Sequence, residues 1–322
     1  MQTILGANGV IGFELAHELH RRGIPLRLVS RTPAKRGLNE ELVAVDLLDA
    51  KATRRAVQGT SVVYLTVGLP YDVRVWKAQW PVIIRNVLAA CKEHQSRLVF
   101  FDNVYMYGLV QGWMTEQSPL HPVSEKGQVR VQVADLLLQA ARAGEVDVRI
   151  ARSADFYGPG ARTGIPNILI FDPLAKGGRP KWLGSATRLH SLTYTRDAAR
   201  ATAELGLRDT LPRGQRVWHL PTDSPALTAE QWVQIAAREL GRTPPPKIQI
   251  LSAGMLRVAG LFQRTIKELV EMLYQYDQDY LFSSEAFEKE FGLKPTPYAQ
   301  GIAETMRRLK EASSSARKHS KP

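Results

Sequence analysis

The stretch "ILGANGVIG", residues 4–12, decides the fold of this chain. Its glycines have the spacing G-x-x-G-x-x-G, and they stand between a short apolar strand and a helical pattern over residues 10–22. In such a turn Gly6 allows the tight bend, Gly9 lets the backbone approach a pyrophosphate, and Gly12 lets the helix pack close to the sheet. The free N–H groups at the helix N-terminus then face the phosphates. The motif in this context predicts a dinucleotide-binding site.

The end of the next strand helps to define the expected cofactor contacts. "IPLRLVS" (24–30) has the apolar pattern of a strand, and it leads to Ser30 and Arg31. NAD sites usually place Asp or Glu there to bind the ribose hydroxyls. A carboxylate would repel a 2′-phosphate, whereas the guanidinium of Arg31 can bind it in bidentate fashion. We therefore predict NADP rather than NAD, against the alternative that Arg31 is only a solvated surface residue. The contacts expected from the two motifs are Gly6, Asn8, Gly9, Val10, Ile11, Gly12, Ser30 and Arg31.

Strands and helices alternate over the first half of the chain. The strand patterns cover 24–30, 42–47, 61–68, 97–105 and 146–158, and the helical patterns cover 10–22, about 50–58, 80–95 and a segment that begins after 121. Alternating elements of this kind pair their strands in parallel and place helices on both faces of the sheet. The predicted fold class is therefore α/β, with a doubly wound Rossmann sheet.

The pattern changes after Gly158, where glycine and proline become dense and the regular elements become short. Further helices are expected at about 227–241 and, as one long amphipathic helix, at about 252–275. The tail 312–322, "ASSSARKHSKP", is polar and basic, and it cannot bury enough apolar surface to order itself. We therefore expect a smaller C-terminal lobe followed by a basic disordered tail.

The composition narrows the class of protein. The chain has 322 residues, a net charge of +12 and one cysteine, Cys91, which excludes an intramolecular disulfide. No apolar run approaches the roughly 20 residues that span a bilayer, and no signal peptide precedes the glycine turn. We expect a soluble, cytoplasmic protein with no membrane partner and no metal site. The basic residues are scattered outside the tail, so no interleaved basic and aromatic patch predicts a nucleic-acid partner.

The chain shares seven segments, in the same order, with one known family. They are "ILGANGVIG" (4–12), "VDLLD" (45–49), "VVYLTVG" (62–68), "FFDNVYMYG" (100–108), "ARSADFYGPG" (151–160), "YTRDAA" (194–199) and "FSSEAFEKEFGLKPTPYAQGI" (282–302). Together they resemble the extended short-chain dehydrogenase/reductases, in particular the NAD(P)-dependent epimerase/dehydratase family. The resemblance covers about residues 1–310.

The resemblance implies a division of the chain and a set of contacts. Residues 1–158 would form the NAD(P)-binding domain, with 190–220 returning to it, and residues 159–189 and 221–311 would form the substrate lobe. Family members often form dimers, so a homodimer is also expected. The further contacts would be Asp46 and Leu47 at the adenine ring, Thr66 and Val67 along the cofactor, and Asp155 at the substrate.

The catalytic positions depart from the family pattern. The family's reaction uses a Ser/Thr, a Tyr and a Lys four residues after the Tyr. None of the ten tyrosines of this chain has a lysine four residues later. Counting from Gly108 places Asn103 at the Ser/Thr position. Counting along "HPVSEKGQVR" places Lys126 at the Tyr position and Arg130 at the Lys position. The resemblance therefore implies an atypical member that lacks the Tyr-x-x-x-Lys motif.

The replacements suggest a revised chemistry. Lys126 and Arg130 are four residues apart on a helix, so they are expected to share a face. Arg130 could hold a ribose but cannot transfer a proton. Lys126 could act as acid or base, and contact the cofactor, if Arg130 and an oxidised nicotinamide lowered its pKa. Asn103 could donate an N–H to a substrate oxygen, and Tyr105 is a second candidate proton donor. The alternative is that Lys126 and Arg130 only bind cofactor or anionic substrate groups.

A second departure concerns the substrate. Nucleotide-sugar members often have an arginine seven residues before the aspartate of "D-x-A", here Asp197, and this chain has His190 there. Arg188 lies two residues earlier and could substitute for it. An aromatic pocket is one interpretation of Tyr71, Trp76 and Trp182, and simple packing is the other.

Three functions follow as hypotheses. The first is an atypical NADP-dependent oxidoreductase or epimerase that transfers hydride to or from a small carbonyl or sugar-like substrate. The second is a non-catalytic NADP(H)-binding protein that senses redox state and regulates a partner, because all three usual catalytic residues are replaced. The third is a nucleic-acid-associated protein that uses the basic surface.

Overall fold

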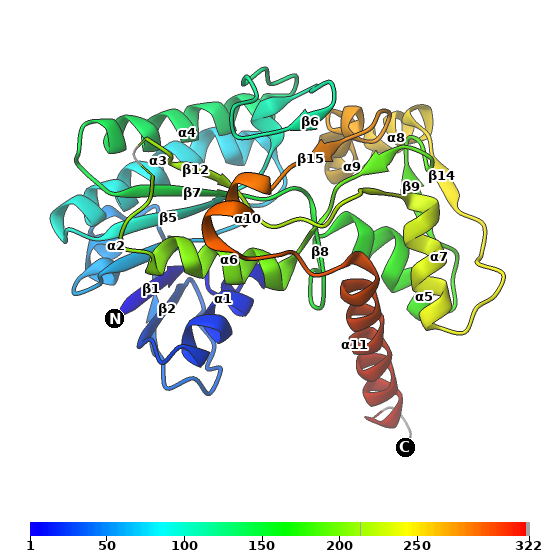
Figure 1. The fold of residues 1–322 in the computed structure, drawn as a ribbon, viewed down its shortest axis with the longest axis horizontal. Coiled ribbons are helices and arrows are strands. Elements are labelled where there is room, and N and C mark those ends of the chain that lie inside the picture. The colour runs from blue at the N-terminus through cyan, green and yellow to red at the C-terminus, as the bar shows by residue number, and fades with distance from the viewer. Residues whose placement is uncertain (213, 320–322) are drawn as a thin grey trace.

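The computed structural model describes residues 1–212 and 214–319 of the chain. Seven strands form one central sheet in the order β12-β7-β5-β4-β1-β2-β3, and every neighbouring pair is parallel (Figure 1). The strand order reverses beside β1, which confirms the predicted doubly wound α/β fold. The strands are β1 (Gln2–Leu5), β2 (Leu26–Ser30), β3 (Glu41–Ala44), β4 (Val62–Leu65), β5 (Arg97–Asp102), β7 (Val148–Arg152) and β12 (Val217–His219).

Helices cover both faces of this sheet, as a parallel sheet requires. α1 (Val10–Arg21) and α6 (Thr195–Leu207) pack together on one face, and α2 (Ala50–Val57), α3 (Val73–Glu93) and α4 (Glu125–Arg142) cover the other. Each face has its own apolar core, and the inward side chains of the strands contribute to both. The segment 190–220 thus supplies one helix and the edge strand β12 to the sheet.

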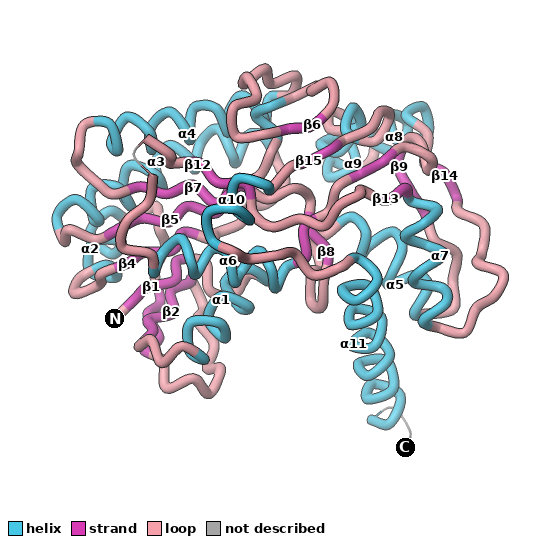
Figure 2. The backbone as a smooth tube through the Cα atoms, viewed as in Figure 1, coloured by secondary structure: helices cyan, strands magenta, loops and turns pink. Residues whose placement is uncertain are grey.

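Most of the remaining residues form a lobe of short strands and helices beside the carboxyl ends of the strands, while α10 (Glu285–Phe291) packs on the edge strand β12 (Figure 2). Its core is aromatic and includes Tyr157, Trp182, Trp232 and Tyr298. The other elements are η1 (Tyr105–Tyr107), β6 (Trp113–Met114), β8 (Phe156–Tyr157), η2 (Asn167–Phe171), α5 (Asp172–Ala175), β9 (Lys181–Leu183), β10 (Leu189–His190), β11 (Thr193–Tyr194), β13 (Leu227–Thr228), α7 (Ala229–Glu239), β14 (Gln249–Leu251), α8 (Ala253–Gly260), α9 (Arg264–Val270), η3 (Leu273–Gln275), β15 (Leu281–Phe282), α10 (Glu285–Phe291) and α11 (Tyr298–His319).

Two expectations about the C-terminal half were wrong. The long helix expected over 252–275 is two helices, α8 and α9, joined by a turn after Gly260. Gly260 allows this because a Cβ there would lie 3.1 Å from the backbone of Lys267, so the two helices approach closely. The tail expected to be disordered from residue 312 continues α11 as far as His319, since no Gly or Pro interrupts the helix there. Residues 320–322 lie outside the described residues.

A buried polar chain joins the ends of β5, β7 and β12. Arg152 donates from Nε to Asp102 at 3.3 Å and from Nη1 to the Tyr107 hydroxyl at 2.9 Å. That hydroxyl lies 2.7 Å from Nε2 of His219, whose Nδ1 lies 2.9 Å from the carbonyl oxygen of Ser283. A carbonyl only accepts, so the His219 proton is on Nδ1, and Nε2 accepts from Tyr107. The hydrogen bonds of this network can all form only while His219 is neutral.

This arrangement predicts a pH-dependent stability. Burial, with a smaller effect of Arg152, lowers the pKa of His219 from 6.5 to about 3. The unfolded chain therefore takes up a proton below pH 6.5, while the folded chain does not until about pH 3. The stabilisation is complete above pH 6.5 and is lost as the pH falls toward 3, by about 1.4 kcal/mol per pH unit.

The measurement is the free energy of unfolding in urea across that pH range, for the wild type and His219→Gln. We expect the gap between the two proteins to be largest above pH 6.5 and to narrow steadily as the pH falls. His20→Gln, at an exposed histidine, is the control and should leave the pH dependence unchanged. A gap that stays constant over the range would contradict the neutral buried His219.

Candidate functional site

The glycine turn after β1 is built by close backbone packing. Gly6 has φ +93°, and a Cβ there would lie 2.5 Å from the backbone nitrogen of Val67. A Cβ on Gly12 would lie 2.7 Å from the carbonyl oxygen of Gly6. The Thr66 hydroxyl donates to the carbonyl of Leu5 at 3.2 Å and so ties β4 to the turn. Only glycine fits at positions 6 and 12, because any side chain would push the helix or β4 away.

At Gly9, neither packing within the described residues nor backbone conformation requires a glycine. Its φ of −70° suits any residue, and the nearest atom to a Cβ there would be 3.5 Å away. It is exposed and forms the N-cap of α1 without a side-chain cap, and the first turn of α1 carries no acidic residue. The first N–H groups of α1, at Val10, Ile11 and Gly12, therefore face outward beside a bare backbone. This cradle fits a phosphate group, so the turn fits the predicted dinucleotide.

The expected adenosine side of the site is open. Arg31 is exposed and has no hydrogen bond or ion pair within the described residues, and the Ser30 hydroxyl accepts from the backbone of Thr32 at 3.2 Å. Asp46 is exposed, and its side chain accepts from the Leu48 backbone at 3.0 Å. The Asn8 side chain donates to the Thr32 carbonyl at 2.8 Å and holds the turn against the loop that carries Arg31.

Sequence reasoning missed a second cation beside this turn. Arg36 donates to the carbonyl of Ala7 at 2.6 Å, and its guanidinium lies 4.6 Å from the ring centre of Phe13 on α1. Burial lowers the pKa of Arg36 from its usual value, and an arginine side chain stays charged in a protein. The basic run "RTPAKR" was the available signal, but only the fold brings Arg36 back to the glycine turn.

The surroundings of Lys126 differ from the expectation that this side chain lies near Arg130 and the nicotinamide. Its side chain has no exposed surface, and Nζ donates to Glu268 Oε2 and Glu271 Oε1, each at 2.5 Å, and to the Glu268 carbonyl at 3.1 Å. Its nearest charges are thus two carboxylates of the lobe, not Arg130 and a nicotinamide. Three acceptors of the lobe, two carboxylate oxygens and one carbonyl oxygen, thus surround the ammonium group. The contacts that the acid–base hypothesis assumed for Lys126 are therefore not the ones that it makes.

Arg130 also differs from the expectation. It points into the interface between α3 and α4, where its guanidinium lies 4.7 Å from the ring centre of Trp76 and 4.4 Å from that of Trp80. Its charge is paired with buried Asp102 at 3.4 Å. Only 6% of Arg130 is exposed, so it is placed to hold helices together rather than a ribose. Lys126 and Arg130 leave α4 toward different partners, because a four-residue spacing aligns Cβ atoms but not long side chains.

Asn103 and Tyr105 follow β5 as predicted. The Asn103 side-chain oxygen accepts from the backbone N–H of Tyr105 at 3.2 Å, so its amide N–H groups remain free to donate. The ring of Tyr105 stacks on Trp76 at 6.2 Å, and Tyr71 meets the same tryptophan edge-on at 6.0 Å. Burial first, and then Tyr71 and Asp155, raise the pKa of Tyr105 well above its usual value. Tyr105 therefore stays protonated and is a weak proton donor.

Asp155 and His190, expected separately at the substrate, are brought together. Asp155 Oδ2 accepts from the Tyr276 hydroxyl at 3.0 Å and lies 3.5 Å from Nε2 of His190. The His190 ring stacks between Tyr276, at 4.9 Å, and Tyr280, at 5.5 Å. Arg188 is exposed and is not part of this group. The substitution of Arg188 for a diphosphate-binding arginine is therefore not supported by its position.

Tyr276 was not identified from the sequence. It lies 121 residues from Asp155, and Asp155 and Tyr105 both contribute to raising its pKa well above the usual value after burial. Tyr71, Tyr105, Asp155, His190 and Tyr276 thus form one polar and aromatic cluster. Trp182 contacts this cluster from the core of the lobe, with its ring centre 5.6 Å from that of Tyr276 and 6.1 Å from that of His190.

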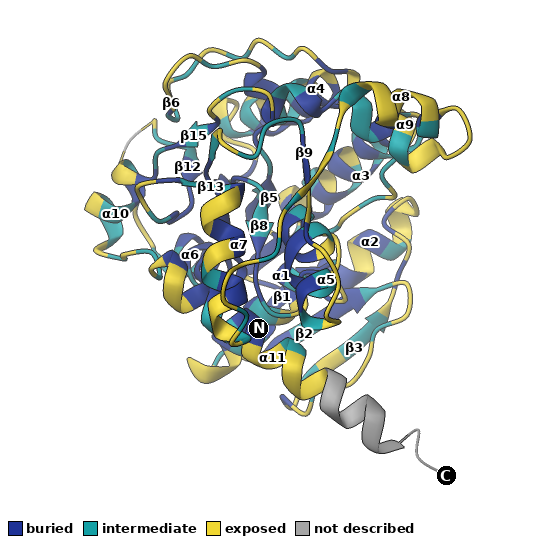
Figure 3. Cartoon of the chain, turned by 90° about the vertical axis from the view of Figure 1, so that its right-hand side faces the viewer, coloured by how far each residue is buried: buried dark blue, intermediate teal, exposed yellow. Residues whose placement is uncertain are grey.

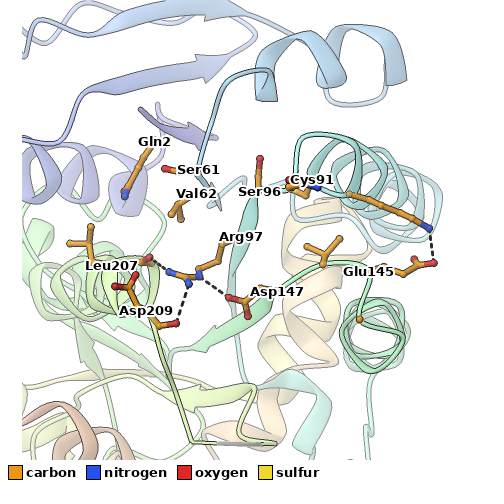
Figure 4. A pocket seen from close by; sticks show the side chains of 15 residues that line it. Gln2, Ser61, Val62, Cys91, Ser96, Arg97, Glu145, Asp147, Leu207 and Asp209 are labelled. Carbon is orange, nitrogen blue, oxygen red and sulfur yellow. Dashed lines mark hydrogen bonds and ion pairs between the residues drawn. The ribbon is translucent and has the colours of Figure 1, made fainter.

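A separate hollow of about 640 Å³ lies at the opposite end of the sheet (Figure 4). It is lined by the start of β1 at Gln2, of β4 at Val62 and of β5 at Arg97. Arg97 donates to Asp147 at 2.7 Å and to the Gly206 carbonyl at 2.8 Å near the end of α6. Its cation is therefore used to close a helix end. Ligands of parallel α/β sheets bind at the carboxyl ends of the strands, so this hollow is not the candidate site.

The comparisons with known proteins agree with this geometry. The model of the NAD dependent epimerase/dehydratase family matches residues 3–212. MoeE5, solved with UDP-glucose and NAD, is 22% identical with a TM-score of 0.76, over 97% of this chain and 99% of that chain. UDP-glucuronic acid 4-epimerase from Bacillus cereus, solved with NAD, is 16% identical with a TM-score of 0.76, over 97% and 99%.

A third solved structure, the dTDP-glucose 4,6-dehydratase DesIV from Streptomyces venezuelae with NAD, is 20% identical with a TM-score of 0.74, over 98% of each chain. Sequence comparison with curated proteins found no match. At these identities the solved structures establish the fold, while the family match extends over well over half of the chain. This protein belongs to the NAD dependent epimerase/dehydratase family.

Proposed function

We propose that the protein is an NADP-dependent oxidoreductase or epimerase that acts on a small carbonyl or sugar-like substrate. One observation carries the proposal. The open phosphate cradle follows β1, Asn103 follows β5, and Asp155 lies three residues beyond β7, so all three stand at the carboxyl edge of one sheet. That edge, at the point where the strand order reverses, is where doubly wound sheets bind their ligands.

The cofactor would be held by the residues of this edge. The N–H groups of α1 would bind the pyrophosphate, Asp46 and Leu47 would contact the adenine, and Thr66 and Val67 would line the path along β4. Bound there, the nicotinamide supplies the site that gives or accepts hydride. The solved relatives carry NAD, and the argument for NADP is the exposed, unpaired guanidinium of Arg31.

Arg31→Ala tests the choice of cofactor. A charge-assisted bidentate contact contributes about 1.5–3 kcal/mol, so the variant should bind NADPH about tenfold to a hundredfold more weakly and NADH almost unchanged. Titration of the quenching of tryptophan fluorescence gives both dissociation constants. Lys35→Ala, in the same loop and with the same loss of charge, is the control and should lower NADPH affinity much less. A wild type that binds NADH at least as tightly as NADPH would refute NADP.

Proton transfer in this proposal falls to the pair of His190 and Asp155. Nδ1 of His190 lies 3.2 Å from the Gln275 carbonyl, which only accepts, so Nδ1 carries a proton. Nε2 is buried without a hydrogen-bond partner and faces Asp155 Oδ2 at 3.5 Å. Nε2 of His190 and Oδ2 of Asp155 are therefore the atoms that would hand a proton to the substrate or take one from it. Asn103 would donate its amide N–H to the substrate oxygen and polarise the carbonyl.

The redox-sensor function remains as a second candidate. It is favoured by one observation, namely that Lys126 and Arg130 both bind groups of the chain itself and not the open edge of the sheet. A redox sensor needs the phosphate cradle for its cofactor. It does not need a free amide at Asn103 or the pair of His190 and Asp155. The two functions therefore differ in what the variants at Asn103 and His190 should do.

The experiment is a turnover assay with NADP(H) against nucleotide sugars, free sugars, aldehydes and ketones, followed by the absorbance of the reduced nicotinamide and by product analysis for epimers. We expect turnover of at least one substrate. Asn103→Ala should lower kcat by about 100-fold to 1,000-fold, as for other lost oxyanion donors. His190→Gln should lower kcat while NADPH affinity is kept.

Lys126→Met, matched in length, is the informative contrast. If proton transfer has left α4, this variant keeps the greater part of kcat provided that it folds, as judged by circular dichroism and NADPH binding. A loss of turnover in a folded Lys126→Met with unchanged His190→Gln activity would return the role to Lys126. No turnover of any substrate, with NADPH binding intact, would favour the sensor.

A further inference from the structure

An apolar tip projects at one corner of the lobe, on α8 and the turn to α9. It consists of Met255, Val258, Leu261 and Phe262, which are 53%, 61%, 81% and 85% exposed. Single exposed apolar residues are common on protein surfaces, whereas four within eight consecutive positions form a continuous patch. α8 and the start of α9 lie at the edge of the molecule and are largely exposed (Figure 3).

The other side of this helix pair is fixed to the body. Leu256 and Gly260 of α8 are buried. On α9, Arg264 donates to Asp72 at 2.7 Å and 2.9 Å, and Glu268 binds the Lys126 ammonium. Because these contacts lie on the inner side, the tip cannot turn inward without breaking a buried ion pair. The apolar side chains are held outward.

The charge around the tip has one sign. Residues 240–267 contain no Asp or Glu and five basic residues, namely Arg242, Lys247, Arg257, Arg264 and Lys267. Lys247, Arg257 and Lys267 are exposed and have no ion pair within the described part of the chain. The carboxylates that follow, Glu268 and Glu271, are turned inward to Lys126. An apolar tip with a cationic surround is complementary to an anionic, partly apolar surface.

We propose that the apolar tip docks on the surface of an anionic lipid bilayer. Leu261 and Phe262 enter the boundary between headgroups and acyl chains, and Lys247, Arg257 and Lys267 bind lipid phosphates. This is attachment to the surface, since no helix of the described residues is long and apolar enough to cross a membrane. A two-fold contact between copies would instead bring the same cations against one another, which disfavours that occupant.

The test is co-sedimentation of the full chain with vesicles of phosphatidylcholine and phosphatidylglycerol, against vesicles of phosphatidylcholine alone. We expect binding to the anionic vesicles only, weakened by salt. Leu261→Ser combined with Phe262→Ser should lower the partition coefficient at least tenfold. Leu109→Ser, at an apolar residue that is 51% exposed outside the tip, is the matched control and should bind like the wild type.

A second set of variants separates local from total charge. The triple variant Lys247→Gln, Arg257→Gln and Lys267→Gln should lose most of the binding and most of the salt dependence. The triple variant Lys51→Gln, Arg85→Gln and Arg162→Gln removes the same charge from other exposed positions and should keep the binding. Circular dichroism and NADPH titration of each variant verify that it is folded.

Three outcomes would overturn the proposal. They are an absence of binding to the anionic vesicles, equal binding by the folded Leu261 and Phe262 double variant, and equal losses in the two charge variants. Sedimentation velocity adds a fourth outcome. In it the wild type is a dimer, the Leu261 and Phe262 double variant is a monomer, and the wild type does not bind vesicles. The tip would then be a contact between copies. All of these measurements are independent of whether a substrate is found.

Discussion

One buried ion pair joins the two halves of this protein. The Lys126 ammonium, in the first turn of α4, has no exposed surface and is held by Glu268 and Glu271 of the lobe. The same carboxylates accept backbone N–H groups at the starts of α3 and α4, from Val73 and Glu125. Removing one partner of such a pair typically costs about 3–5 kcal/mol, because a charge is then left buried and uncompensated. The contact thereby holds the end of α9 in the lobe against the starts of α3 and α4.

Lys126 has this structural use at the position where the resemblance to the family places a tyrosine. A phenol at the start of α4 is useful when a nearby cation lowers its pKa. Here that position carries the cation, and Arg130 is paired with Asp102 between two tryptophans. The polar groups left at the sheet edge come from loops after β5 and β7 and from the lobe. Asn103, Asp155 and His190 are among the described residues that keep unused donors or acceptors.

The fold and the glycine turn were predictable because their causes are local. The spacing of Gly6, Gly9 and Gly12 between a strand and a helix specifies a turn whose packing leaves no room for side chains at two of the three positions. The alternation of strands and helices specifies a parallel sheet. The helix starts were predicted less well. α3 begins at Val73, after the Asp72 cap, and not at residue 80, and Pro81 lies inside the helix although proline is typical of a first turn.

The sequence by itself determined the doubly wound sheet, the glycine cradle and the residues at the strand ends. Only the tertiary structure decided what the charged residues do. Glu268 and Lys126 are 142 residues apart, and Tyr276 and Asp155 are 121 residues apart, so no local pattern records either pairing. The direction of a long side chain and the charge of its neighbours depend on contacts between distant segments. Spacing along a helix therefore placed Lys126 and Arg130 on one face but could not assign their partners.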